Sequence, residues 1–225
     1  MQILLDTANV ETIRRYNEIY NISGVTSNPT IISREKADFF KTLCCIREII
    51  GEEKQLHVQV TASTFEEMLK EAECIVKKLG KNTYIKVPVN EVGIKTIKIL
   101  KQNGYNVTAT AIYSLQQAML AASVGADYVA PYFNRMCNCN YDMPSVISDM
   151  VKLYEVHSMK TKLLVASFKN TNQILQALLA GAQAVTASPE LYSTMLESPN
   201  VESAIDIFTN DWIKTYANKR IYELN

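Results

Sequence analysis

The amino-acid sequence predicts an α/β protein folded as a (β/α)8 TIM barrel, and the spacing of its glycines is the first reason. Six of the seven glycines directly or closely precede a short run of residues that favour β-structure: Gly24, Gly51, Gly80, Gly104, Gly125 and Gly181. Glycine is favoured where a helix ends in a left-handed residue just before the next strand. The successive intervals are 27, 29, 24, 21 and 56 residues, and each of the first four suits one strand, one helix and two loops.

Strand-forming segments are the second reason. Seven of them lie at residues 2–6, 25–26, 56–60, 84–87, 105–108, 128–130 and 184–186. The long interval of 56 residues holds one more, 162–167, so that interval corresponds to two units. Eight strands alternating with helices in a chain of this length indicate a closed barrel.

Helical periodicity between the strands is the third reason. Residues 65–79 place Met68, Ala72 and Ile75 three to four positions apart on one face. Similar patterns predict helices over 91–102, 114–124 and 171–180. A doubly wound open sheet is the alternative, but it usually has a glycine-rich turn after its first strand, and residues 6–9 contain no glycine.

Residues 1–225 are predicted to form one barrel domain, with an additional helix over about 200–220 beyond the eighth unit. Ile205, Phe208, Trp212 and Tyr216 fall on one stripe of that helix. The stripe packs either against the outer ring of its own barrel or against a neighbouring subunit, and the residues alone leave both open.

The composition argues against several kinds of partner. Lysine and arginine total 23 and aspartate and glutamate total 23, so the formal net charge is zero, whereas nucleic-acid binding needs clustered positive charge. No apolar run approaches the roughly 20 residues that cross a bilayer, and the amino terminus has no basic leader. An odd number of cysteines, five, is typical of reduced thiols. We expect a soluble, cytoplasmic protein that binds neither nucleic acid nor membrane.

Polar residues at the strand ends are the candidate site, because barrel enzymes act at the carboxyl ends of their strands. In chain order these residues are Asp6, Thr26, Ser27, Asn28, Gln59, Thr61, Lys86, Thr108, Thr110, Tyr132, Asn134, Arg135, Ser167, Lys169, Thr186 and Ser188. Asp6 is the only carboxylate among them, and neither His57 nor His157 is placed as a ligand, whereas a metal site needs three or four clustered ligands. Cys137 and Cys139 form an isolated pair in a loop. We therefore expect no metal and no other cofactor.

Lys86 stands out because it lies among apolar residues on a predicted interior strand. Alternation places Tyr84, Lys86 and Pro88 on one face. Burial disfavours the ammonium form and lowers the pKa of a lysine, and a neutral amine attacks a carbonyl to form a Schiff base. The structural alternative is a lysine at a strand edge that extends its amine to solvent.

Neighbouring rim residues suit carbonyl chemistry on a polyhydroxylated substrate. Asp6 would transfer protons or hold a hydroxyl, and Thr26 and Asn28 would bind further hydroxyls. Tyr132 would act as a general acid or base, directly or through an ordered water. The alternative is a purely structural role, in which Asp6 caps the following helix and Thr26 or Ser27 is a turn residue.

A phosphate group is expected at the opposite part of the rim. The planar fork of Arg135 suits phosphate or carboxylate. Ser167 and Lys169 precede a helix predicted to begin near Thr171. Barrels often bind phosphate after the seventh strand, where a helix N-terminus offers free N–H groups.

Five segments of the chain resemble the transaldolase superfamily, specifically its small subgroup of fructose-6-phosphate aldolases and short transaldolases. The matching strings are LLDTA at 4–8, GVTSNPT at 24–30, YIKVP at 84–88, YVAPYFNR at 128–135 and VASFK at 165–169. They span nearly the whole chain, in order, and coincide with the predicted strand ends.

The resemblance implies class I aldolase chemistry on a sugar phosphate without a metal, and Lys86 looks like the Schiff-base lysine. The residues that match the dihydroxyacetone-binding positions are Asp6, Thr26 and Asn28, and those that match the phosphate end are Arg135 and Ser167. The predicted catalytic residues are Lys86, Asp6, Tyr132, Gln59 and Thr110, and the predicted substrate-binding residues are Thr26, Ser27, Asn28, Arg135, Ser167 and Lys169. The subgroup forms rings of five subunits stacked as decamers, which favours a homo-oligomer and the intersubunit interpretation of the final helix.

Two residues bear on whether the bound three-carbon unit is released or transferred. Transaldolases share a glutamate on the third strand, at the position where this chain has Gln59. They commonly have phenylalanine on the sixth strand, at the position where this chain has Tyr132. A tyrosine hydroxyl can position or donate the proton that releases the product. We expect an aldolase that cleaves fructose 6-phosphate reversibly to dihydroxyacetone and glyceraldehyde 3-phosphate. The alternative is a transaldolase of the pentose phosphate pathway that moves the same unit from sedoheptulose 7-phosphate to glyceraldehyde 3-phosphate.

Two segments depart from the family pattern, the run TASP at 186–189 and the loop MCNCN at 136–140. Both lie near the predicted mouth, so acceptor preference and phosphate affinity stay open. Two other classes compete with the aldolase: a non-catalytic sugar-phosphate sensor, and a metal-free isomerase with an acid–base pair. A sensor has no obvious use for the complete set of polar residues at the strand ends. An isomerase needs an acid–base pair, and Asp6 is the only carboxylate at the strand ends.

Overall fold

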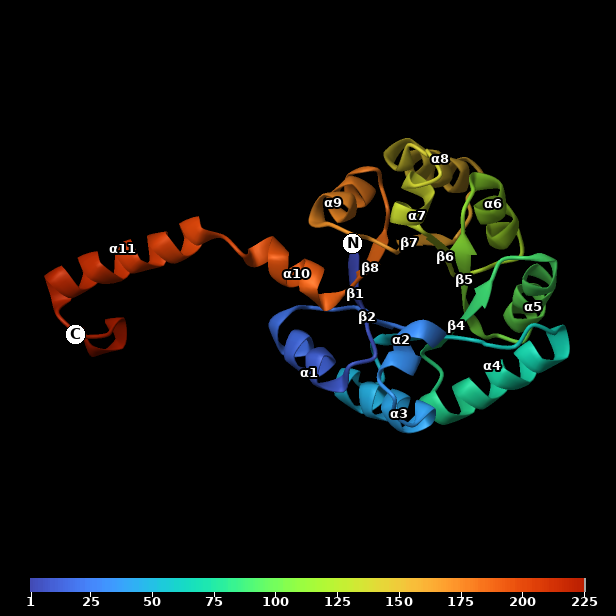
Figure 1. Cartoon of the computed structure of the whole chain (residues 1–225), viewed down its shortest axis with the longest axis horizontal. Helices are drawn as coiled ribbons and strands as arrows, with labels where there is room; N and C mark the ends of the chain where they lie inside the picture. Colours follow the sequence, from blue (N-terminus) through green and yellow to red (C-terminus); the bar gives the residue numbers. More distant parts are fainter. Residues whose placement is uncertain (225) are drawn as a thin grey trace. The chain divides into compact units, whose positions relative to one another are not determined.

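The computed structural model describes residues 1–224, which form two compact units, Met1–Tyr192 and the segment from Ser193 onward. The first unit is a closed barrel of eight parallel strands that pair in chain order (Figure 1). The strands are β1 (Gln2–Asp6), β2 (Gly24–Thr26), β3 (Gln55–Gln59), β4 (Thr83–Pro88), β5 (Asn106–Ile112), β6 (Tyr128–Pro131), β7 (Lys162–Val165) and β8 (Ala184–Ala187). Leu4 of β1 lies opposite both Gly24 and Thr186, which closes the ring. The predicted (β/α)8 barrel is confirmed.

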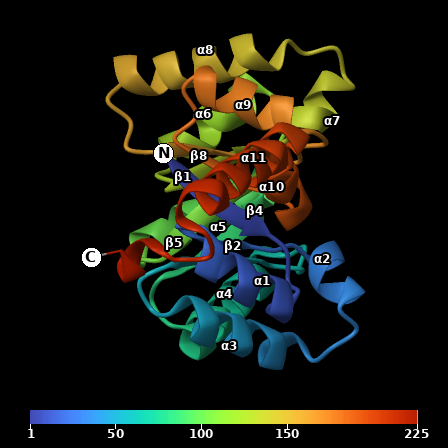
Figure 2. The ribbon, with the colours of Figure 1, turned by 90° about the vertical axis from the view of Figure 1, so that its left-hand side faces the viewer.

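Helices surround the strands of this unit, with α3 and α4 on the opposite side from α8 and α9 (Figures 1 and 2). The helices are α1 (Val10–Ile19), α2 (Pro29–Arg34), α3 (Phe39–Ile50), α4 (Phe65–Leu79), α5 (Glu91–Gln102), α6 (Leu115–Ser123), α7 (Phe133–Cys137), α8 (Met143–Val156), α9 (Thr171–Leu179) and α10 (Pro189–Leu196). Helices α4 and α5 have the predicted bounds, whereas the short helices α2 and α7, after β2 and β6, were not predicted. None of the described helices is long and apolar enough to cross a membrane.

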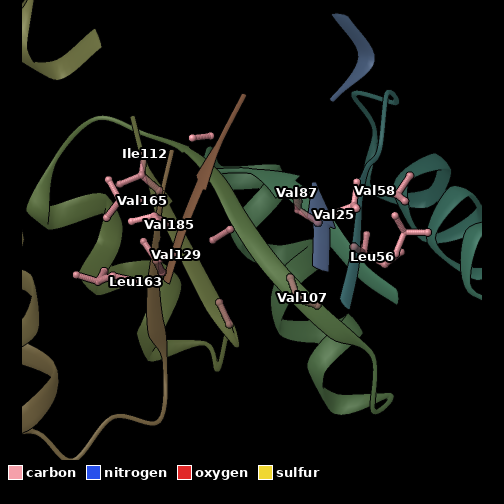
Figure 3. Packing of buried hydrophobic residues seen from close by; sticks show 14 of the residues in the cluster. Val25, Leu56, Val58, Val87, Val107, Ile112, Val129, Leu163, Val165 and Val185 are labelled. Atoms are coloured by element: carbon pink, nitrogen blue, oxygen red, sulfur yellow. The ribbon is translucent and has the colours of Figure 1, made fainter. Parts of the chain in front are cut away.

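The wall of the barrel separates two apolar regions. Outward-facing strand residues such as Val25, Val87 and Val129 are fully buried in one continuous core between strands and helices (Figure 3). A smaller cluster fills part of the interior and consists of Leu4, Tyr128, Leu164 and Ala184, with Tyr84 packed against it. Because side chains alternate along a strand, the remaining inward positions are free to carry polar groups.

Of the six glycines predicted to follow helix ends, five have positive φ at or just after the end of a helix, and Gly24 is the exception. Gly51 and Gly80 are the C-caps of α3 and α4, with φ of 73° and 87°. Gly24 instead lies inside β2, where a Cβ would stand 2.2 Å from the carbonyl oxygen of Gln55. Glycine is required there by the close approach of two strands and not by a left-handed turn.

Arg47 of α3 joins several loops at the amino-terminal ends of β3 and β4. Its side chain is 6% exposed, and all five N–H donors are used. Nε donates to the carbonyl of Leu79, Nη1 to those of Gly51 and Lys54, and Nη2 to the carbonyl of Asn82 and to Thr83 Oγ1, at distances of 2.7–3.3 Å. A single buried guanidinium therefore supplies donors to four main-chain carbonyls at this end of the barrel.

The second unit contains helix α11 (Pro199–Tyr216) and the 3-10 turn η1 (Ile221–Glu223). The predicted C-terminal helix is thus present. Trp212 packs on Tyr216 with 4.4 Å between ring centroids, and its Nε1 donates to the carbonyl of Lys219 at 2.8 Å. None of the side chains described in α11 is buried.

Candidate active site

Lys86 lies at the centre of the candidate site, on β4. Gln59 of β3 and Thr108 of β5 are its register partners, and Nζ donates to the carbonyl oxygen of Ser27 at 2.6 Å. The residue is only 6% exposed, so the alternative of a lysine reaching solvent from a strand edge is wrong. Burial lowers the pKa of the Lys86 amine, and the charge of Asp6 opposes this shift. The amine is therefore shifted toward the neutral, nucleophilic form.

Asp6 and two threonines form a hydrogen-bonded group across β1, β2 and β8. Thr26 Oγ1 donates to Asp6 Oδ1 at 2.7 Å and lies 2.7 Å from Thr186 Oγ1. Because the Thr26 proton is used on Asp6, Thr186 is the donor in the second bond. Burial raises the pKa of Asp6, while Lys86 and the Thr26 hydroxyl act in the opposite direction. A carboxyl whose pKa is raised in this way is suited to exchange protons near Lys86.

Asp6 does not cap the following helix, because Asn9 accepts from Thr12 N and is the N-cap of α1. Asn28 is itself a cap, since its Oδ1 accepts from Ile31 N at 3.0 Å at the start of α2. This bond fixes the Asn28 side chain and leaves its NH2 group as the donor for a ligand.

Gln59, Thr110 and Tyr132 supply a second set of polar groups, from β3, β5 and the residue after β6. Thr110 Oγ1 lies 3.1 Å from the Tyr132 hydroxyl. Gln59 Oε1 is buried, and within residues 1–224 it has no hydrogen-bond partner. Buried polar atoms are normally satisfied by protein or by ordered water, so this oxygen is an acceptor for a water or a ligand.

Arg135 lies on α7, beside the Tyr132 ring. Its Cζ is 4.8 Å from the centroid of that ring, and its Nη1 donates to the hydroxyl of Tyr113 at 2.9 Å. Within the described chain, residues 1–224, no carboxylate pairs with Arg135. The guanidinium is held by neutral groups only, so its charge remains available to an anion.

Ser167 and Lys169 lie on the loop before α9. Ser167 adopts φ of 65°, and its carbonyl accepts from Asn134 N at 3.0 Å. Asn134 Oδ1 also accepts from Gln173 Nε2 at 3.0 Å. These two bonds join α7 to the start of α9 and so bring Arg135 to the side of the mouth where Ser167 and Lys169 lie.

His57 lies below this mouth on β3, two positions before Gln59 and so on the same face of the strand. Its Nε2 lies 3.0 Å from Gln55 Oε1 and its Nδ1 2.8 Å from Thr108 Oγ1, and its ring stacks on Tyr84 at 4.6 Å. An amide oxygen only accepts, so Nε2 carries the proton and Nδ1 accepts from Thr108. Burial and the charge of Lys86 lower the pKa of His57 well below 6.5, so the imidazole is neutral.

The sequence analysis did not identify Tyr113 as a site residue. The register of β5 shifts between Ala109 and Ile112, and this irregularity brings Tyr113 into contact with Arg135.

Within residues 1–224, no group of three or more histidine, cysteine, aspartate or glutamate side chains could hold a metal ion. All five cysteines are free, Cys137 and Cys139 included.

Comparisons with known proteins show which family the chain resembles along nearly its whole length. Residues 3–223 match the model of a family described as transaldolase/fructose-6-phosphate aldolase. A Streptococcus pneumoniae protein named "Probable fructose-6-phosphate aldolase" is 45% identical over 213 residues, which cover 94% of this chain and 96% of that protein.

Solved structures with low sequence identity show the same fold. Inosine 5′-monophosphate dehydrogenase from Legionella pneumophila superposes with a TM-score of 0.60 at 16% identity, over 85% of this chain and 58% of the dehydrogenase. A structure described as native KDPGal gives a TM-score of 0.59 at 10% identity, over 84% and 85% of the two chains.

Proposed function

Since this chain belongs to the transaldolase/fructose-6-phosphate aldolase family, a family of enzymes, we propose that it is a Schiff-base aldolase. Its reaction is the reversible cleavage of fructose 6-phosphate to dihydroxyacetone and glyceraldehyde 3-phosphate. The observation that carries this proposal is Lys86, a buried amine with a lowered pKa at the carboxyl end of a barrel strand.

Schiff-base formation begins with attack of Lys86 Nζ on the C2 carbonyl of the ketose. The new C–N bond gives a carbinolamine, and loss of its hydroxyl as water gives the iminium ion. Asp6 is the group that donates the proton to the departing hydroxyl, because its raised pKa favours the protonated form. Thr26 and Asn28 bind hydroxyls of the three-carbon unit.

Cleavage breaks the C3–C4 bond: its electron pair forms the C2=C3 double bond of the enamine, and the π pair of the iminium group returns to nitrogen. The C4 hydroxyl passes its proton to a water held by Gln59 Oε1, Thr110 and Tyr132, and its oxygen becomes the aldehyde oxygen of the departing glyceraldehyde 3-phosphate. The same water then returns the proton to C3, and hydrolysis of the resulting iminium ion frees dihydroxyacetone and Lys86. The unpartnered Gln59 oxygen and the Thr110–Tyr132 pair support this role.

The phosphate of the substrate binds at Arg135, Ser167 and Lys169. Arg135 has no carboxylate partner within residues 1–224, so a dianionic phosphate meets an uncompensated charge. The N-terminal turn of α9 adds favourable dipole interactions on the same side.

The decisive experiment supplies fructose 6-phosphate to the purified protein with no acceptor aldose and measures free dihydroxyacetone. Sustained release over many turnovers identifies an aldolase. No release of free dihydroxyacetone, followed by sedoheptulose 7-phosphate formation when erythrose 4-phosphate is added, would identify a transaldolase and refute the meaning assigned to Gln59 and Tyr132.

A trapping experiment tests the lysine. Sodium borohydride with dihydroxyacetone should reduce the Schiff base and add a stable mass to the peptide that contains Lys86. Lys86→Met should abolish both the adduct and the activity, while Lys70→Met, at a lysine on the outer helix α4, should change neither. An adduct on another lysine would refute the assignment of Lys86.

We further propose that the enzyme is a cytoplasmic homo-oligomer, a pentamer or decamer as the family resemblance implies. The five free thiols suit a reducing compartment. Ile205 and Phe208 of α11 are 51% and 70% exposed, which suits an intersubunit contact. The mass in solution should fall when Phe208→Glu is introduced, and an unchanged oligomer would refute this use of α11.

A further inference from the structure

Strand β5 contains an extra residue beside the candidate site. Its pairing with β6 passes from Ala109–Val129 to Ile112–Pro131, so three steps on β5 correspond to two on β6. Ala111 lies within this bulge and has φ of 58°. A left-handed alanine is uncommon and mildly strained, and bulges of this kind often redirect side chains next to active sites.

The bulge reverses the direction of the residues that follow it. Alternation from Thr108 and Thr110, which face inward, would send Ile112 inward and Tyr113 outward. The structure has the opposite arrangement: Ile112 is fully buried in the core between strands and helices, and Tyr113 packs edge-on against Tyr132 with 5.5 Å between centroids.

Tyr113 is fixed in this position from two sides. Its backbone N–H donates to Gln117 Oε1 at 2.7 Å, and its hydroxyl accepts from Arg135 Nη1 at 2.9 Å. Arg135 in turn lies over the Tyr132 ring. The three side chains Tyr113, Tyr132 and Arg135 therefore form one packed group at the mouth, which we name the Tyr113 group.

We propose that Tyr113 is a positioning residue that confers preference for phosphorylated aldehydes by holding the Arg135 guanidinium at the mouth. This inference rests on the proposed function of the same site. Arginine has a long side chain with many rotamers, and fixing it on binding carries an entropic cost. A neutral hydroxyl that holds the side chain beforehand reduces this cost without competing for the charge, as a carboxylate would.

The test compares two acceptor aldehydes in the direction of aldol addition, with dihydroxyacetone as donor. Glyceraldehyde 3-phosphate carries the phosphate and glyceraldehyde lacks it. Tyr113→Phe should raise KM for glyceraldehyde 3-phosphate about tenfold, the loss expected for one hydrogen bond to a charged group. Its kcat, and its kcat/KM with glyceraldehyde, should change less than roughly twofold.

Matched variants separate positioning from general structural damage. Tyr141→Phe removes an exposed hydroxyl a few residues after α7 and should leave the ratio of the two kcat/KM values unchanged. Ala111→Gly accepts the left-handed backbone and should keep the ratio, whereas Ala111→Val opposes it and should lower the ratio as Tyr113→Phe does.

Two results would overturn the inference: an unchanged ratio in Tyr113→Phe, or an equal loss in Tyr141→Phe. A parent protein inactive with both aldehydes would overturn the proposed function and this inference together. An active parent whose ratio does not respond to Tyr113→Phe would overturn this inference alone.

Discussion

Acidification should unfold this protein in a way that depends on one buried histidine. His57 is fully buried, hydrogen-bonded through both nitrogens, and neutral because burial and Lys86 lower its pKa well below 6.5. In the unfolded chain its pKa returns to about 6.5. The unfolded state therefore binds more protons than the folded state as the pH falls through 6.5, and the difference approaches one proton at lower pH.

The sign and size of the effect follow from this difference. A depressed pKa in the folded state means that stability is fully present above the unfolded pKa and is lost as the pH falls toward the folded pKa. Between pH 7.5 and pH 5.5, the contribution of His57 to the free energy of unfolding falls by about 1.4 kcal/mol. Asp6 contributes in the opposite sense, because its pKa is raised by folding.

The assay is urea unfolding at both pH values and one protein concentration, which keeps any effect of subunit association constant. His57→Phe preserves the ring that stacks on Tyr84 but cannot take up a proton, so its stability should fall by about 1.4 kcal/mol less than that of the parent. His157→Asn, which removes the other histidine at the exposed end of α8, is the matched control for the loss of a histidine. Equal pH dependence in parent and His57→Phe would refute the neutral, buried imidazole.

Three further outcomes are expected. Arg47→Met should lower the free energy of unfolding by about 3 kcal/mol, because it removes all five hydrogen bonds of a buried guanidinium. Arg14→Met, at an exposed position of α1, is its control, and equal losses in urea titrations would contradict the hydrogen-bond argument. Tyr132→Phe should reduce aldol cleavage about a hundredfold and transfer to an added aldose much less; equal reduction in coupled assays of both reactions would remove the proposed protonation role. Thr186→Val removes the hydroxyl that donates to Thr26, so it should lower the free energy of unfolding by about 1 kcal/mol and reduce the rate of dihydroxyacetone addition. Thermal unfolding and an addition assay measure these two effects, and an unchanged rate would show that Thr186 has no part in the chemistry.

The barrel was predictable because its signals are local and repeated. Helix ends such as Gly51 and Gly80 need left-handed glycine, and each marks the start of a new unit regardless of its neighbours in space. Gly24 shows where this reasoning stops. Its glycine is required by contact with Gln55 on the adjacent strand, and such a contact between elements leaves no local pattern.

The direction of individual side chains was predictable only while the alternation of the strand held. Lys86 and Gln59 lie on unbroken strands and meet in register as alternation requires. Tyr113 follows a bulge at Ala111, and alanine gives no sign of a left-handed conformation in the sequence. The capping of α2 by Asn28 was hidden for a different reason: the string of residues shared with the family suggested a ligand contact, while the short helix itself has too few residues to show a period.

The hydrogen bonds of Arg47 have a consequence for how this protein tolerates mutation. Four of its five acceptors are main-chain carbonyls, which every amino acid possesses. Side chains at Lys54 and Asn82 can therefore be exchanged without removing a carbonyl acceptor, whereas lysine, with its single nitrogen, cannot replace Arg47. Saturation mutagenesis of Arg47, Lys54 and Asn82 should reveal one nearly invariant position beside two more permissive ones, in a region far from the reacting atoms.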